Sequence, residues 1–494
     1  MYRIIKKSII AFSALMVVQA CNKKDVIELT PEFTLDALTN PSSMAQVEQV
    51  LGGAYAGFRN ANYYGSGSGT GAGWSLMPDV MSDNLYETTE SLANSRTMAD
   101  FLYNPSTGQV GTFYTAPYSV VANANIVLRD VDKFTTTANK KMANRIKGQA
   151  YAIRALAHFD VFRYFADKYD RNSSDLAVPY IKEFVASTTY KSARPTNKAF
   201  YDDLFADLTQ AVTLLSDVDK TINPSTALTR PNIDLAAAYA IQARAYLYAG
   251  MYAEAETAAT NAIALRPLVN LNQAAFSGMY NQTNAGEIIW NVQFESGQSG
   301  PTFLVFFATN NRSYFRPAPE IATVAGTTGL IKSNDIRYTA YFTPVGTGGL
   351  ALTKYKGKGT VSDGNANFPA IRTGEMYLIR AEARAKQTGK EVLGLADLNT
   401  LRAARINGYV PIVATGNALL TEIANERRAE LVGEGHRFFD LKRTTRTLQR
   451  GAACGSTISV SGICSLPSTA REWTLPIPDA VRNPNPAYQQ NPGY

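Results

Sequence analysis

Three glutamates near the end of the chain have a spacing that could support chemistry. Glu426, Glu430 and Glu434 are four residues apart, so one face of a helix would carry all three carboxylates. They could hold a hard cation, or two of them could serve as general acid and base. However, basic residues crowd the same segment, namely Arg427, Arg428, Arg437 and Lys442. We therefore predict a partly buried ion-pair network that fixes this segment to the rest of the fold.

The two histidines of the chain are each predicted to be structural. His158 lies among apolar residues in a helical pattern, and His436 lies between Gly435 and Arg437. No partner motif near either one would complete a nucleophilic triad, and two His with three Cys are too few for a His-rich or Cys-rich metal centre. The glycine-rich string at 65–73 lacks the Lys-Ser/Thr of a phosphate-binding loop. We predict no catalytic residue, no metal and no cofactor, and therefore no enzyme.

The first cysteine, Cys21, follows a segment with the features of a secretory signal. Residues 1–20 have a basic start and an apolar run at 8–18 that is too short to span a bilayer. A Cys directly after the cleavage point is typical of bacterial lipoproteins, in which acyl chains on that residue hold the protein at the membrane. We predict a signal peptide at 1–20, lipidation of Cys21 and a polar tether at 21–41. Plain cleavage with Cys21 left free is the alternative.

The other two cysteines, Cys454 and Cys464, flank nine residues that could fold back as a short hairpin. Export would place them in an oxidising compartment, where we expect them to form a disulfide. Two free thiols are the alternative.

Aromatic residues are abundant and the charge is nearly balanced. The chain has 27 Tyr, 22 Phe and 3 Trp, and its net charge of +7 falls to +4 once the three cations of residues 1–20 are removed. With no dense basic stripe, nucleic acid is not a predicted partner. A sugar binder needs Trp or Tyr faces for the C–H sides of the rings, and paired donors and acceptors for the hydroxyls. Two loop segments offer that mix, with the candidate residues Tyr63, Tyr64, Trp74, Asp83, Asn84, Asn311, Arg312, Tyr314 and Arg316. Ordinary loop packing is the alternative for each.

Helical pairs must position these residues. Residues 241–267 repeat small and Tyr residues, break at Gly250 and end at Pro267, which is the tetratricopeptide pattern. Weaker copies pair 44–60 with 112–131, 143–167 with 197–215, and 371–386 with 392–405. One pair cannot bury its own face, so about four pairs predict a mainly α, tetratricopeptide-like solenoid. Long irregular loops and a few short strands are predicted at 61–111 and 268–370.

Four segments carry more specific motifs. They are KGQAYAIRALAHFDVFRYFADKY at 147–169, LIRAEARA at 378–385, NERRAELVGEGHRFFDLKR at 425–443 and LPIPDAVRNPNPAYQQNPGY at 475–494. Together, and in this order, they resemble the SusD/RagB family of bacterial outer-membrane nutrient-binding lipoproteins. The resemblance marks a structural family motif at Glu426, Arg427, Arg428, Glu430, Glu434, His436, Arg437 and Asp440.

The resemblance implies one SusD-like domain at 42–494. Its helical scaffold would occupy about 42–60, 112–267 and 371–443, with ligand-facing loops at 61–111 and 268–370 and a C-terminal segment at 444–494. It also implies a lipid-anchored location on the outer face of a gram-negative outer membrane, although Lys23 and Lys24 stand where family members often carry acidic residues.

The function implied by the resemblance is capture of an oligosaccharide and its delivery to a SusC-like TonB-dependent β-barrel transporter. Two alternatives stay open. The protein could bind peptides as RagB-like members do, or it could be a tetratricopeptide-type envelope scaffold without a ligand of its own.

Overall fold

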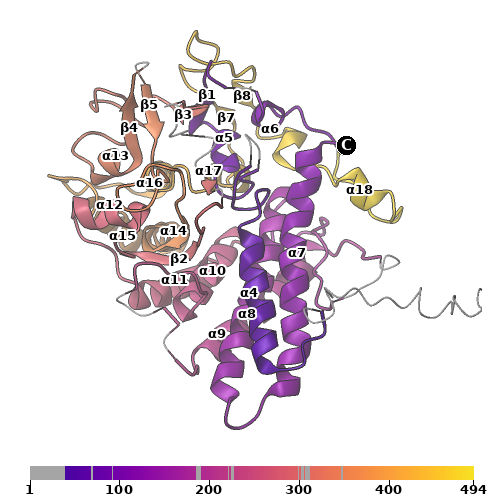
Figure 1. The fold of residues 1–494 in the computed structure, drawn as a ribbon. Helices are drawn as coiled ribbons and strands as arrows, with labels where there is room; N and C mark the ends of the chain where they lie inside the picture. Colours follow the sequence, from indigo (N-terminus) through magenta and orange to yellow (C-terminus); the bar gives the residue numbers. More distant parts are fainter. Residues whose placement is uncertain are drawn as a thin grey trace, which may run out of the picture.

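Helices that pack side by side form the body of the protein (Figure 1). The structure is a computed structural model that describes residues 39–494, apart from 68–70, 92, 185–190, 221, 224–226, 299, 302–304, 306–311 and 347–348. Its longer helices are α4 (Met44–Phe58), α7 (Gly108–Asp130), α8 (Lys140–Phe165), α9 (Asn197–Leu215), α10 (Leu235–Tyr248), α11 (Tyr252–Leu265), α12 (Gln273–Asn281), α14 (Thr373–Ala385), α15 (Glu391–Ala403) and α16 (Gly416–Glu430).

Four helical pairs follow one another as a solenoid. Helix α4 packs on α7, α8 on α9, α10 on α11, and α14 on α15, while α7 with α8 and α11 with α14 join one pair to the next. Helix α16 packs against α14. Figure 1 shows α4, α7 and α8 as long neighbouring helices, from which the later pairs continue around the molecule. The predicted mainly α, tetratricopeptide-like fold with four pairs is confirmed.

Small residues allow the helices to approach closely. A Cβ atom on Gly148 of α8 would lie 2.8 Å from the Cγ atom of Leu215 in α9, so only glycine fits at this crossing. Gly250 ends α10 with a φ of +73°, a left-handed conformation that glycine adopts without strain. This glycine makes the turn between α10 and α11 that the sequence predicts.

Short strands and helices order the segments between the pairs. Each strand pair is antiparallel: β1 (Leu85–Glu87) with β3 (Phe315–Pro317), β2 (Ile288–Val292) with β6 (Phe368–Arg372), β4 (Phe342–Val345) with β5 (Gly349–Leu352), and β7 (Leu448–Gln449) with β8 (Ser465–Leu466). The short helices are α5 (Met77–Val80), α6 (Arg96–Ala99), α13 (Ile336–Tyr341), α17 (Arg437–Arg443) and α18 (Asp479–Arg482), with 3-10 turns at Val131–Phe134 and Arg471–Trp473. The β1–β3 pair joins two segments that the sequence analysis treats as separate loops.

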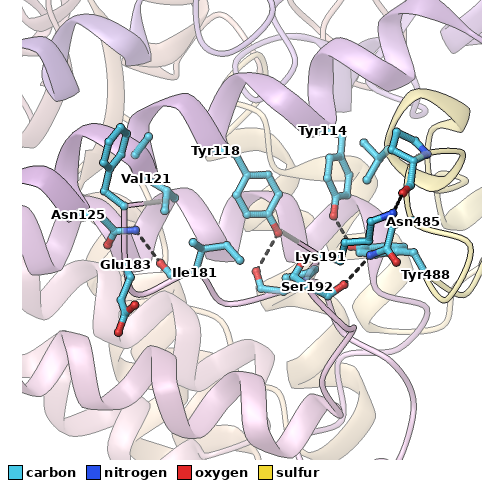
Figure 2. Close-up of a pocket in the computed structure, with 15 residues that line it drawn as sticks. Tyr114, Tyr118, Val121, Asn125, Ile181, Glu183, Lys191, Ser192, Asn485 and Tyr488 are labelled. Atoms are coloured by element: carbon cyan, nitrogen blue, oxygen red, sulfur yellow. Dashed lines mark hydrogen bonds between the residues drawn. The ribbon is translucent and has the colours of Figure 1, made fainter. Parts of the chain in front are cut away.

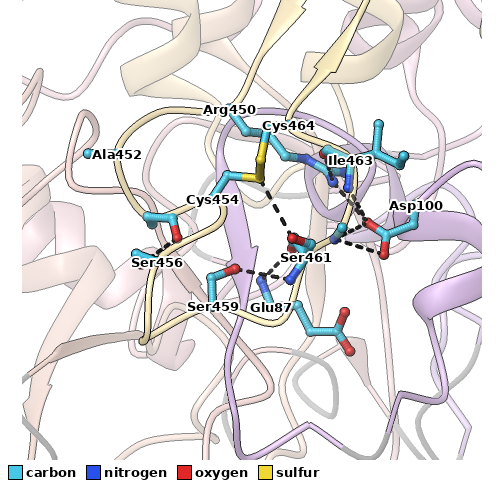
Figure 3. The surroundings of a disulfide bond; sticks show 12 residues. Glu87, Asp100, Arg450, Ala452, Cys454, Ser456, Ser459, Ser461, Ile463 and Cys464 are labelled. Atoms are coloured by element: carbon cyan, nitrogen blue, oxygen red, sulfur yellow. Dashed lines mark hydrogen bonds and ion pairs between the residues drawn. A yellow bond between two sulfur atoms is a disulfide. The ribbon is translucent and has the colours of Figure 1, made fainter.

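A disulfide closes a loop in the C-terminal segment, as the sequence analysis expects (Figure 3). Cys454 and Cys464 are bonded. The loop between them is held from outside, because the backbone N–H of Gly462 donates to Asp100 Oδ2 over 3.1 Å and that of Val460 donates to the carbonyl of Glu87 over 3.0 Å. The loop therefore ties the end of the chain to the segment around β1.

Candidate ligand-binding site

The predicted ion-pair network exists, and Glu430 lies at its centre. Its side chain is fully buried, and its carboxylate accepts hydrogen bonds from Arg337 Nη1 at 2.8 Å, from Arg405 Nη2 at 2.9 Å and from Arg372 Nη1. Burial alone would raise the pKa of Glu430, but the three guanidinium groups outweigh it and hold the pKa well below its ordinary value. Glu426 pairs with Arg337 and with Arg402. The first two glutamates are thus saturated by arginines.

One detail of the prediction is wrong, since the three glutamates do not share a helix face. Helix α16 ends at Glu430, and Gly433 and Gly435 have φ values of +73° and +77°. A Cβ atom on Gly435 would lie 2.0 Å from the carbonyl oxygen of Trp74, so the turn must pass this point as glycine. Glu434 therefore leaves the helix, and it reaches the network through Lys354 Nζ at 2.7 Å and Arg372 Nε at 2.8 Å.

The rest of the motif ties α16 and α17 together and to the segment after α5. Arg427 Nε donates to Asp440 Oδ2 over 2.8 Å, and its Nη2 contacts Nδ1 of His436 at 3.2 Å. Burial and the surrounding arginines lower the pKa of His436 well below its ordinary value, so the ring is neutral at pH 7.

Two predicted ligand-binding residues, Asp83 and Asn84, are used by this motif. Arg437 makes a two-bond contact with Asp83, at 2.7 and 2.8 Å, and Arg428 Nε donates to Asn84 Oδ1 over 2.9 Å. Burial raises the pKa of Asp83, but Arg437 and Arg428 outweigh this and lower it. Both residues are buried, so they are structural contacts of the motif and not ligand contacts.

The structure corrects the predicted role of three aromatic residues, Tyr63, Tyr64 and Trp74, as stacking platforms for a sugar. Their exposed fractions are 0%, 2% and 1%. The two tyrosine hydroxyls donate to Asp160 Oδ2 over 2.7 and 2.9 Å, and Trp74 Nε1 donates to the Asp160 carbonyl over 3.1 Å. The three rings surround a buried carboxylate in the core and present no face to a ligand.

The second predicted loop contributes little exposed surface among its described residues. Tyr314 and Arg316 are buried, and Arg316 Nη2 donates to Glu90 Oε1 over 2.6 Å. The prediction that Tyr314 and Arg316 contact a ligand is therefore wrong. Arg312 is exposed, and it stays a predicted ligand residue. Asn311 and the lipid-anchor residue Cys21 lie outside the described residues.

A tyrosine-lined pocket of about 320 Å³ lies elsewhere, on α7 (Figure 2). Tyr114, Tyr118, Val121 and Asn125 follow the helix with the spacing of one face. Opposite them lie residues 179–184, residues 191–192 and the C-terminal segment around Asn485 and Tyr488, as Figure 2 shows.

Backbone hydrogen bonds fix the pocket wall. The carbonyl of Ile181 accepts from Asn125 Nδ2 at 3.0 Å, and its N–H donates to Nε2 of His158 over 2.8 Å. Because Nε2 accepts that bond, the ring proton must lie on Nδ1, which donates to the carbonyl of Arg154. Burial lowers the pKa of His158 to about 3, which keeps the ring neutral in this role. His158, predicted to be structural, thus holds the backbone of Ile181, a residue of the pocket wall, in place.

The polar groups of the pocket are mostly used within the protein. The Tyr118 hydroxyl donates to the Pro179 carbonyl over 2.8 Å, the Tyr114 and Tyr488 hydroxyls bond each other, and Asn485 Nδ2 donates to the Ser192 carbonyl over 2.9 Å. The pocket therefore offers ring faces, with Phe184 and the exposed Glu183 at its edge. Such a surface can bind the apolar face of a ring.

Sequence analysis missed this pocket because its walls are distant in the chain. Tyr114 and Tyr118 are four apart in a helical pattern, which by itself indicates core packing. Tyr488 reaches them across 374 residues. The one signal in the sequence was Tyr488, an aromatic residue of the C-terminal motif to which no role was given.

Two protein-family models match the chain. Residues 326–494 match the model of the SusD family. Residues 36–247 match a SusD-like model described as starch-binding and associating with the outer membrane. The two ranges do not overlap, and together they span most of the chain. The chain belongs to the SusD family.

Individual SusD relatives are similar to this chain in sequence or in fold. SusD-like protein P38 of Formosa agariphila is 24% identical over 387 residues, which cover 67% of this chain and 72% of that protein. A SusD superfamily protein from Bacteroides thetaiotaomicron superposes with a TM-score of 0.77 at 22% identity, covering 91% of this chain and all of the other. A SusD-like carbohydrate binding protein from Bacteroides vulgatus gives 0.73 at 20% identity, covering 90% and 97%. Among the residues that the structure describes, no helix is long and apolar enough to cross a bilayer.

Proposed function

We propose that this SusD-family protein is a non-catalytic lipoprotein that binds an oligosaccharide at the cell surface and passes it to a SusC-like TonB-dependent transporter. The observation that carries the proposal is that SusD family models match both the N-terminal and the C-terminal part of the chain. The model that matches the N-terminal part is described as starch-binding and associating with the outer membrane. The Bacteroides vulgatus protein of the same fold is named as carbohydrate binding.

The tyrosine-lined pocket is the proposed glycan contact. Tyr118 and Phe184 offer partly exposed rings on which the C–H face of a sugar can stack. Glu183 and Lys191 lie at the exposed rim, where they can meet ring hydroxyls. The carboxylates of the C-terminal motif are occupied by arginines, which argues against their use as an acid and base pair.

The proposed anchor leaves the fold close to this pocket. The carbonyl of Thr39, the first described residue, accepts a hydrogen bond from Arg129. The Arg129 guanidinium lies 5.8 Å from the ring centroid of Phe184, at the pocket edge. The chain that leads back to a lipidated Cys21 would therefore leave the described fold beside the pocket.

Calorimetric titration against a panel of neutral and acidic oligosaccharides and peptides tests the proposal. Tyr118→Ala and Phe184→Ala should each weaken the best ligand roughly tenfold, since an aromatic stacking contact contributes about 1 kcal/mol beyond its buried area. Tyr118→Phe keeps the ring, and Tyr409→Ala removes a ring that does not line the pocket, so both should bind as the wild type does. The proposed transporter partner is tested by purifying the lipidated protein from its host membrane and identifying the proteins that co-purify, among which we expect one β-barrel transporter.

A panel without any bound glycan, together with no co-purifying barrel transporter, would overturn the proposal. A peptide as the best ligand would replace the oligosaccharide with the RagB-like alternative. Capture of several envelope proteins in place of one transporter would favour the scaffold.

A further inference from the structure

Two adjoining hollows meet at the end of α17, away from the tyrosine-lined pocket. The larger, of about 820 Å³, lies between residues 167–170 after α8, the α10–α11 turn, residues 441–446 and residues 468–474. The smaller, of about 270 Å³, lies between the end of α14, the outer face of α16 and α17. Arg443 and Arg446 line both, and the two adjoining hollows are together called here the α17 groove. Its size is that of a typical ligand site.

The α17 groove is rich in positive charge. Eight basic and four acidic side chains line it. Several of the basic groups are neutralised by the fold, as where Arg443 bonds Glu382 at 2.6 and 2.8 Å and Arg427 bonds Asp440. The remaining excess of positive charge faces the hollow.

Two cations, Lys386 and Arg446, carry most of this excess. Lys386, Lys442 and Arg446 form no ion pair with any residue in the described part of the chain. Lys442 Nζ donates to the Ala166 carbonyl over 2.7 Å at the C-terminal end of α8, and burial lowers the pKa of this amine to about 7. Lys442 therefore has a structural role as well. The guanidinium of Arg446, which lines both hollows, has no such partner among the residues that the structure describes.

The backbone that presents Arg446 is strained. Thr445 has a φ of +51°, and a β-branched residue in the left-handed region is an outlier that most helix ends avoid by using glycine. Such conformations concentrate at functional sites, because the surrounding structure must hold them. Here the conformation directly precedes Arg446, which lines both hollows.

We propose that the α17 groove binds a glycan through its anionic groups, namely the carboxylates of uronic acids or sulfate esters, with Arg446 as the main contact. The guanidinium fork matches the geometry of such oxyanions and can bond them through two donors. Lys386 lines the smaller hollow and Lys442 the larger one, which is also lined by Thr445, Ser468 and Thr469. A concave groove with hydroxyls suits a glycan chain better than the flat surface of a bilayer. The choice of a glycan as the occupant rests on the proposed function, whereas the anion site rests on the groove alone.

Affinity electrophoresis and calorimetry with dextran sulfate, and with unsulfated dextran of the same chain length, test this inference. Wild type should bind dextran sulfate and not dextran. The Arg446→Gln/Lys386→Gln double variant should bind it at least tenfold more weakly, since hydrogen bonds to charged groups are the strong ones. Arg59 does not line the groove, is partly exposed and forms no ion pair with any described residue, so Arg59→Gln removes one charge elsewhere and should stay within about twofold of wild type. Circular dichroism melts verify that each variant is folded.

Equal weakening by Arg59→Gln would show that only overall charge matters and would overturn the inference. So would unchanged binding by the double variant, or equal binding of the two dextrans.

Phosphatidylglycerol vesicles are the second arm, and Arg446-dependent binding to vesicles but not to dextran sulfate would make the groove a lipid contact instead. Tyr118→Ala should leave dextran sulfate binding intact. If no glycan of the neutral panel binds but dextran sulfate still requires Arg446, the proposed oligosaccharide pocket fails while the anion site stands.

Discussion

Replacing Glu430 by glutamine should strongly destabilise the fold. The carboxylate accepts hydrogen bonds from three buried guanidinium groups, those of Arg337, Arg372 and Arg405. Glutamine keeps the shape of the side chain but removes its charge, so all three cations lose their shared counter-ion. Removing one partner of a single buried ion pair costs about 3–5 kcal/mol. Because Glu287, Glu426 and Glu434 still serve these arginines, we expect about 4 kcal/mol.

Denaturant unfolding of wild type and variant at pH 7 measures this loss. Glu422→Gln is the matched control, since Glu422 pairs with Arg402 at 2.8 Å but is 38% exposed, and it should change stability by less than about 1 kcal/mol. A loss below about 1 kcal/mol for Glu430→Gln would refute the view that this residue organises the network.

The same pair of proteins should respond differently to acid. The pKa of Glu430 is depressed in the folded state, so its contribution is complete above the unfolded value of about 4.3 and is lost as the pH falls through the folded value. The stability gap between wild type and Glu430→Gln should therefore be constant from pH 7 to 5 and shrink below pH 4. A gap that grows on acidification would contradict the assignment.

Two further predictions concern the histidine behind the pocket and the disulfide. The pKa of His158 is lowered to about 3 by burial, so its contribution is complete above pH 6.5 and is lost as the pH falls; between pH 6.5 and 5 wild type should lose about 2 kcal/mol that His158→Gln does not lose, and equal acid sensitivity of the two would disprove it. Replacing both Cys454 and Cys464 by serine opens a short loop and should lower stability by about 3 kcal/mol in denaturant unfolding, to the level of the reduced wild type; no difference between oxidised and reduced wild type would contradict this.

Local sequence predicted the helical scaffold well, because helix periodicity and helix ends are encoded by neighbouring residues. The predicted helix at 197–215 matches α9, and the break at Gly250 separates α10 from α11. The motif at 425–443 predicted an ion-pair network from the density of opposite charges alone. The helix end at Glu430 escaped notice, since the requirement for Gly435 comes from the Trp74 carbonyl, far away in the chain.

What only the tertiary structure decided is which aromatic and polar side chains remain available to a ligand. Tyr63, Tyr64 and Trp74 have the composition of a sugar platform, but Asp160 of α8 takes their donors and holds them in the core. Tyr118 looks like a core residue of a helix, yet it lines a pocket closed by the other end of the chain. The sequence by itself determined the paired helices, the cysteine pair and the charged motif, because these depend on spacing along the chain. Exposure depends on contacts between residues hundreds of positions apart, and spacing carries no information about those.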